Sequence, residues 1–99
     1  MSYEYSATAA LTDGEVRQLK ASLLDHGLVL RVQEEPRRIL LRFARRPARE
    51  QWPEDIELRF GEVVYVAFHS ASGAERREFL EHLESRLSRI GHVCSFEEP

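Results

Sequence analysis

The sequence predicts an α+β domain, a two-layer sandwich in which two helices cover one face of a mostly antiparallel sheet of five to six strands. Three observations lead to this prediction. Two capping boxes, Thr12–Glu15 and Ser72–Glu75, each precede apolar residues at helical spacing. Gly27 and Gly91 then end the two helical stretches. Around these stretches, short runs alternate apolar and polar residues, as half-buried strands do.

Residues 3–9 alternate aromatic or small side chains with polar ones, which predicts a first strand. In the capping box that follows, the Thr12 hydroxyl can accept the amide N–H of Glu15, and the Glu15 carboxylate can reach back. The apolar residues of this first helix recur three or four positions apart: Val16, Leu19, Leu23 and Leu24.

Two alternating runs, 28–33 and 38–45, predict a hairpin joined by a turn at 34–37 that contains Pro36. In the first run we expect Leu28, Leu30 and Val32 to face the core, and Val29, Arg31 and Gln33 to face the other way. In the second run the expected inward residues are Ile39, Leu41 and Phe43, with Arg42 on the opposite face.

Residues 46–54 form an expected loop, because two prolines flank Trp52. Beyond it, 56–60 predicts a strand with Ile56, Leu58 and Phe60 inward. The run 63–69 is apolar on both faces, which favours a central strand. The residues between these runs, Gly61 and Glu62, indicate a tight hairpin turn or a bulge within one long strand.

The second capping box opens a helix whose inward residues are Phe79, Leu80, Leu83, Leu87 and Ile90. After Gly91, residues 92–96 predict a short final strand. The resulting order, β-α-β-β-β-β-α-β, resembles a variant of the ferredoxin-like plait with an extra strand in the middle. This resemblance is one of topology and implies nothing about function.

Composition indicates one globular domain spanning residues 1–99, since 42% of the residues are hydrophobic and 31% are charged. No apolar run is long enough to span a bilayer, and no basic-then-apolar leader precedes Tyr3. The single cysteine, Cys94, suits a reducing compartment. We therefore expect a cytoplasmic protein without a membrane association. Thirteen arginines against one lysine indicate a GC-rich, bacterial genome.

The sequence contains no motif for catalysis or for a cofactor. Neither a G-x-x-x-x-G-K nor a G-x-G-x-x-G loop is present. The four histidines and Cys94 show none of the short spacings of a metal site. His92 and Cys94 lie two apart on one expected strand, about 7 Å from each other, which is too far for direct proton transfer. We therefore expect no enzyme, no metal and no cofactor.

The segment from Arg37 to Arg49 carries six arginines and no acid, and it is followed by Trp52. Guanidinium groups beside an exposed indole would suit a nucleic-acid surface. However, acids border this segment on both sides, and the net charge of the chain is −3. The alternative interpretation is that these arginines pair with those acids on the sheet. Trp52 itself is either a core plug or an interface anchor.

These observations favour a non-catalytic protein-binding module, most plausibly a bacterial immunity protein or antitoxin that neutralises a toxin by occluding it. Acidic clusters would then pair with a basic cleft of the toxin. A nucleic-acid-binding module using Arg37–Arg49 and a small-ligand regulatory domain remain alternatives, and the chain could be a monomer or a homodimer. The candidate partner-binding residues are Arg31, Arg42, Arg45, Arg46, Arg49, Trp52, Glu54, Asp55, Glu57 and Arg59.

Overall fold

The computed structural model describes residues 3–45 and 53–98 of the chain. Its elements follow in the order β1 (Tyr3–Thr8), α1 (Asp13–Asp25), β2 (Val29–Glu35), β3 (Arg38–Phe43), β4 (Ile56–Phe60), β5 (Val63–Phe68) and α2 (Gly73–Arg89).

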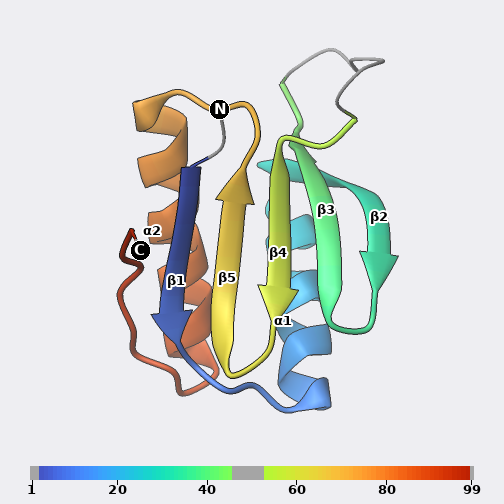
Figure 1. Cartoon of the computed structure of the whole chain (residues 1–99). Coiled ribbons are helices and arrows are strands. Elements are labelled where there is room, and N and C mark those ends of the chain that lie inside the picture. The colour runs from blue at the N-terminus through green and yellow to red at the C-terminus, as the bar shows by residue number, and fades with distance from the viewer. Residues whose placement is uncertain (1–2, 46–52, 99) are drawn as a thin grey trace.

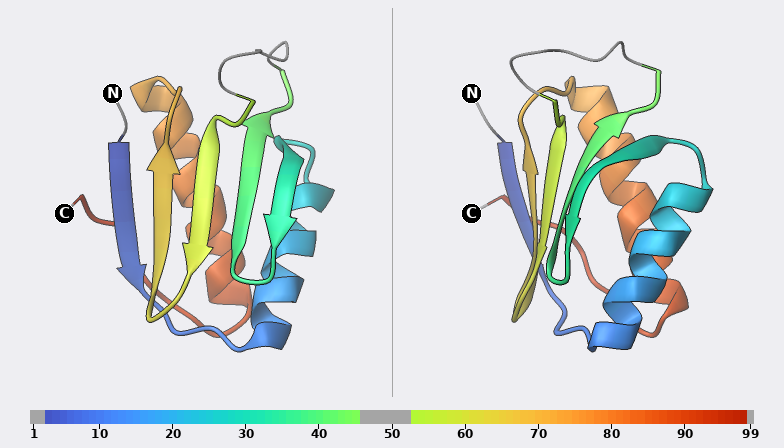
Figure 2. Two further views of the ribbon diagram at one scale, coloured as in Figure 1. Left: turned by 45° about the vertical axis from the view of Figure 1, so that its right-hand side comes forward. Right: turned by 90° about the vertical axis from the view of Figure 1, so that its right-hand side faces the viewer.

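The five strands form one sheet in the order β1-β5-β4-β3-β2, and every neighbouring pair is antiparallel (Figure 1). Both helices lie on the same side of this sheet, as the two rotated views show (Figure 2). No other described element covers the opposite side, which we call the open face. The predicted two-layer α+β sandwich is thus confirmed.

Both helices begin at the predicted capping boxes. The Thr12 hydroxyl accepts the Glu15 amide N–H at 3.1 Å, and the Glu15 carboxylate accepts the Thr12 N–H at 2.9 Å. Ser72 and Glu75 make the same reciprocal pair at 3.2 and 2.8 Å. These bonds satisfy amide groups that a helix leaves unpaired in its first turn, so they fix where each helix starts.

The core lies between the sheet and the helices. Phe68 of β5 is packed edge-on between Tyr5 of β1 and Phe79 of α2, with ring centroids 5.8 Å apart in both pairs. The alternation predicted for β3 and β4 places their apolar residues here, each no more than 5% exposed: Ile39, Leu41, Phe43, Ile56, Leu58 and Phe60. Gly61 and Glu62 form the hairpin turn between β4 and β5, since Phe60 pairs with Val64 and the Gly61 N–H bonds the Val63 carbonyl.

The prediction for the faces of β2 was wrong for Val29 to Arg31, whereas Gln33 faces the open side as expected. Val29, expected to face outward, is buried, whereas Leu30, expected in the core, is 40% exposed. The pairing register of β2 with β3 also shifts between Arg31 and Gln33. A bulge of this kind places two residues opposite one and breaks the alternation on which the prediction relied.

The predicted final strand, residues 92–96, is not formed. Beyond α2, the residues that the structure describes, up to Glu98, make a single bridge, in which Glu97 pairs with Ser6 of β1. Two of the backbone N–H groups that precede this bridge bond to α2: that of His92 donates to the Leu87 carbonyl, and that of Phe96 donates to the Glu84 carboxylate. The resemblance to a ferredoxin-like plait therefore extends to the layers and to the order of elements as far as α2.

The one lysine of the chain, Lys20, is buried between α1 and the hairpin of β2 and β3. Its ammonium group donates to the carbonyl oxygens of Glu35 and Pro36 and lies 3.2 Å from the Glu34 carboxylate. Because three oxygen atoms surround the charge, burial costs little here. Lys20 thereby ties α1 to the edge strand β2.

A pair of histidines joins the two helices on the helix side of the molecule. His26, which caps α1, stacks on His82 of α2 with ring centroids 4.5 Å apart, and Arg86 lies 3.5 Å from His26 Nδ1. Burial, together with the nearby His26, Arg86 and Arg89, lowers the pKa of His82 from 6.5 to about 4. The fold therefore favours a neutral His82.

We predict that the protein loses stability as the pH falls from about 6.5 towards 4. The unfolded chain takes up a proton on His82 near pH 6.5, whereas the folded chain resists it, so acid favours unfolding by at most about 1.4 kcal/mol per pH unit from this residue. Urea denaturation at pH 7 and pH 4.5 measures the loss. His82→Gln should show a smaller loss than the unsubstituted protein, and an unchanged loss would contradict the assignment.

Candidate functional site: the open face of the sheet

Two rows of side chains cross the open face. The strand registers place the residues of each row directly opposite one another, and such residues share a face of the sheet. The first row, from β2 to β1, is Glu35, Arg38, Arg59, Tyr65 and Ser6. The second is Gln33, Leu40, Glu57, Ala67 and Glu4.

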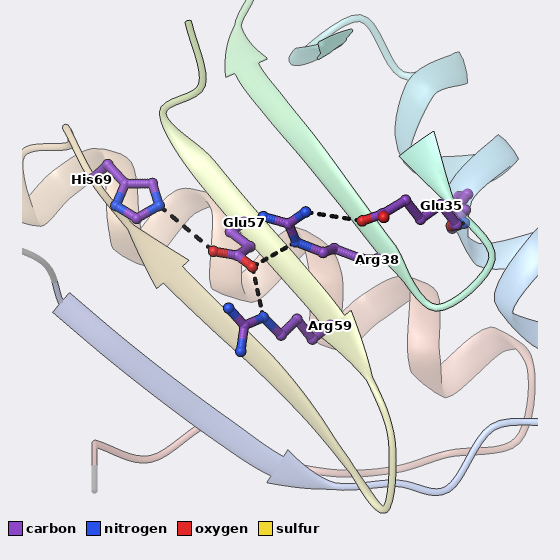
Figure 3. A network of polar contacts seen from close by, with 6 residues as sticks. Glu35, Arg38, Glu57, Arg59 and His69 are labelled. Atoms are coloured by element: carbon purple, nitrogen blue, oxygen red, sulfur yellow. Dashed lines mark hydrogen bonds and ion pairs between the residues drawn. The ribbon is translucent and has the colours of Figure 1, made fainter. Parts of the chain in front are cut away.

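Glu57 lies at the centre of this face, and two arginines converge on its carboxylate (Figure 3). The Nε atoms of Arg38 and Arg59 donate to the same oxygen, Oε2, at 2.8 and 2.6 Å. Arg38 and Arg59 are themselves directly opposite across β3 and β4, a placement in which like charges repel. The carboxylate between them converts this repulsion into attraction. We call these three residues the Glu57 clamp.

The side chain of Glu57 is only 9% exposed, although no described element covers it. Its direct neighbours in the register, Leu40 on β3 and Ala67 on β5, are 7% and 3% exposed. These apolar neighbours exclude water from the carboxylate. Its second oxygen, Oε1, lies 3.8 Å from His69 Nε2 (Figure 3).

Further contacts extend the clamp to both edges of the sheet. On one side, Arg38 Nη1 donates to Glu35 of β2 at 2.9 Å. On the other, the Arg59 guanidinium lies 5.5 Å from the ring centroid of Tyr65, whose hydroxyl donates to Glu4 of β1. The resulting polar network touches all five strands.

The network shifts the proton affinities of its members. Burial alone would raise the pKa of Glu57, but the hydrogen bonds from Arg38 and Arg59 outweigh it, so the pKa is lowered. Bonds to Glu35 and Glu57 raise the pKa of Arg38. The bond to Glu4, aided by burial, raises the pKa of Tyr65 to about 12. Glu57, Arg38 and Tyr65 therefore keep their ordinary charge states at neutral pH.

The structure brings only part of the predicted binding set together. Glu57 and Arg59 belong to the network, and Arg42 lies half-buried on the same face, opposite Leu30. Arg45 is exposed just beyond β3, and Glu54 is half-buried before β4. Arg46, Arg49 and Trp52 lie outside the described residues.

Two of the predicted binding residues lie elsewhere than expected. Asp55 is 5% exposed and accepts the Phe43 N–H at 2.9 Å, so it holds β3 to the start of β4 and is not part of an acidic surface cluster. Arg31 is paired in register with Leu41, which places it on the side of the helices, where it contacts Glu34 at 3.1 Å. The bulge after Arg31 explains why simple alternation misplaced it.

Sequence reasoning missed Arg38, Tyr65, Glu4 and His69 as members of this face. The signal that would have found them is the register between strands, because Glu57 meets Arg38 only once β3 and β4 are aligned. A hollow of about 520 Å³ adjoins the network between the two hairpin turns. Its lining includes Pro36, Phe60 and Gly61 beside the two arginines of the clamp.

The described residues hold no group of three or more His, Cys, Asp or Glu side chains that could bind a metal ion. Within the same parts of the chain, neither helix is long and apolar enough to cross a membrane. No family model, curated protein or solved structure matches the chain.

We predict that Glu57→Gln lowers the free energy of unfolding by about 2–3 kcal/mol, because it leaves two opposed arginines without the charge that joins them. Urea denaturation at pH 7 measures the effect. Glu35→Gln is the matched control, since Glu35 contacts the same Arg38 from an exposed position and its loss should cost much less. Equal losses in the two variants would show that the clamp does not organise the face.

Proposed function

We propose that the protein is a non-catalytic protein-binding module whose open face covers a partner. The observation that carries this proposal is a bare sheet face crossed from edge to edge by one polar network, with an adjoining hollow lined in part by Pro36 and Phe60. Side chains already held in place lose little freedom on binding, which favours affinity. Arginine and tyrosine are also the residues most enriched among binding hot spots.

The kind of partner we propose is a toxin domain, with this chain as its immunity protein or antitoxin in the bacterial cytoplasm. Neutralisation by occlusion needs a stable flat surface and no catalytic group. Exposed acids lie at both ends of the network, Glu35 on β2 and Glu4 on β1, and these would approach a basic cleft. Glu35 is one of the acids that border the Arg37–Arg49 segment, whereas Asp55, another of them, is buried.

The nucleic-acid alternative draws less support from the described arginines. Arg38 and Arg59 share one carboxylate, and Arg38 has a second acid at 2.9 Å. A phosphate would have to compete with these internal partners. Among the described arginines of the Arg37–Arg49 segment, Arg37 and Arg45 are exposed outside the strands, and Arg37 is already paired with Asp13 at 2.7 Å.

Co-expression with the product of the neighbouring gene tests the proposal. We predict a stoichiometric complex by size-exclusion chromatography with light scattering, and at least tenfold weaker binding for Arg59→Ala. Arg77→Ala, an exposed arginine on α2, is the matched control and should change the affinity less than twofold. Recovery of the chain alone, or equal effects of the two variants, would refute the proposal.

Two further measurements separate the alternatives. Nucleic-acid binding would give a mobility shift that weakens with salt and with Arg45→Ala and Arg46→Ala, in place of a protein complex. A regulatory ligand would raise the melting temperature of the isolated chain in a metabolite screen.

A further inference from the structure

The outer edge of β1 is only partly occupied. Ser6 exchanges two backbone hydrogen bonds with Glu97, each of 3.0 Å, so both its N–H and its C=O point away from β5. In an antiparallel ladder this orientation repeats every second residue. The backbone groups of Glu4 and Thr8 therefore also point to the outer edge, where they have no backbone partner among the described residues.

The C-terminal tail, residues 92–98, pairs with this edge at Glu97 and stands away from it over Val93–Ser95. A hollow of about 350 Å³ separates Ser6–Thr8 from Val93–Ser95, and Val93 is 89% exposed. In the register set by Ser6 and Glu97, the residue opposite Glu4 would be Pro99, which has no N–H to donate. The sequence of the tail thus limits its own pairing along β1.

A few contacts hold the tail in place. Phe96 packs against the core, and its N–H donates to the Glu84 carboxylate at 2.9 Å. His92 Nε2 lies 3.1 Å from Glu15 Oε2. Phe96 would stand opposite Ala7, whose side chain points inward, whereas Glu97 is opposite Ser6 on the open-face side. The edge therefore already accepts an apolar residue followed by a polar one.

The opposite edge of the sheet, β2, is protected against strand pairing. It carries a bulge after Arg31 and the charged side chains of Arg31 and Glu34, and Lys20 occupies the carbonyl oxygens at its end. Bulges and charged residues are the devices by which proteins block edge-to-edge association. β1 shows no bulge in its six paired residues.

We propose that the edge of β1 binds an extended segment of a partner protein, which pairs as an additional antiparallel strand and displaces the tail. The segment carries an apolar side chain opposite Ala7, in the place of Phe96. Three residues later, opposite Glu4, it carries a lysine or arginine, because a basic side chain there would pair with the Glu4 carboxylate. This site shares Glu4 with the open face, but it does not depend on the function proposed for that face.

The probe is the peptide Thr-Phe-Thr-Val-Lys-Thr, in which Phe and Lys stand three residues apart. Amide exchange of the full-length chain, followed by NMR, should show new protection at Glu4 and Thr8 when the peptide is added. Glu97→Pro removes the N–H that bonds Ser6 and leaves Phe96 intact, so this variant should bind the peptide at least fivefold more tightly. Replacing Lys of the peptide by Glu should weaken binding by a similar factor.

Several results would overturn the proposal. Absence of protection at Glu4 and Thr8 in both proteins would exclude strand addition at this edge. Protection at Val29 and Arg31, whose backbone groups point to the outer edge of β2, would place the peptide on β2 instead. Equal binding of the Lys and Glu peptides would exclude the contact with Glu4. Dimerisation of Glu97→Pro in sedimentation, with β1 amides protected in the absence of peptide, would make a second copy of the chain the occupant.

Discussion

The contact on which the open face depends is the pair of hydrogen bonds that one oxygen of Glu57 receives from Arg38 and Arg59. The strand register sets two guanidinium groups opposite each other on an uncovered sheet, and this arrangement is unfavourable without a charge between them. Glu57 supplies that charge from a position that Leu40 and Ala67 keep dry. This one carboxylate orients both arginines. Arg38 in turn contacts Glu35, and Arg59 contacts Tyr65.

The strand order explains why such a network can exist. α1 and α2 both cover the inner face, and β4, which carries Glu57, is the middle strand of five. A charged residue at the centre of a sheet can therefore reach partners on both sides. The two edges differ: β2 is tied to α1 by Lys20 and interrupted by a bulge, whereas β1 has no register shift and, among the described residues, meets the tail in one bridge. The molecule thus combines an open face whose side chains are held by the Glu57 clamp with an edge, β1, at which we propose that a partner strand displaces the tail.

Local sequence patterns predicted most of the fold. The capping boxes at Thr12 and Ser72, and the alternation in β3 and β4, predicted the helix starts and the inward residues. Predictions failed where tertiary contacts decide. A bulge left Val29 to Arg31 on the faces opposite to those predicted, and the predicted final strand is reduced to one bridge, between Glu97 and Ser6. For the site, sequence reasoning selected Glu57 and Arg59 but missed Arg38 and Tyr65, because their contacts depend on a register that periodicity does not encode.

The most direct test of this account is the pKa of Glu57, followed through its side-chain carboxyl carbon by NMR as the pH is lowered. Burial and the two guanidinium groups act on this pKa in opposite directions, so its direction shows which of them dominates. The account predicts a pKa below 4.5, with Arg38 Nε and Arg59 Nε losing their hydrogen bonds as Glu57 takes up its proton. A pKa above 4.5, or guanidinium signals that do not respond to this titration, would contradict the clamp.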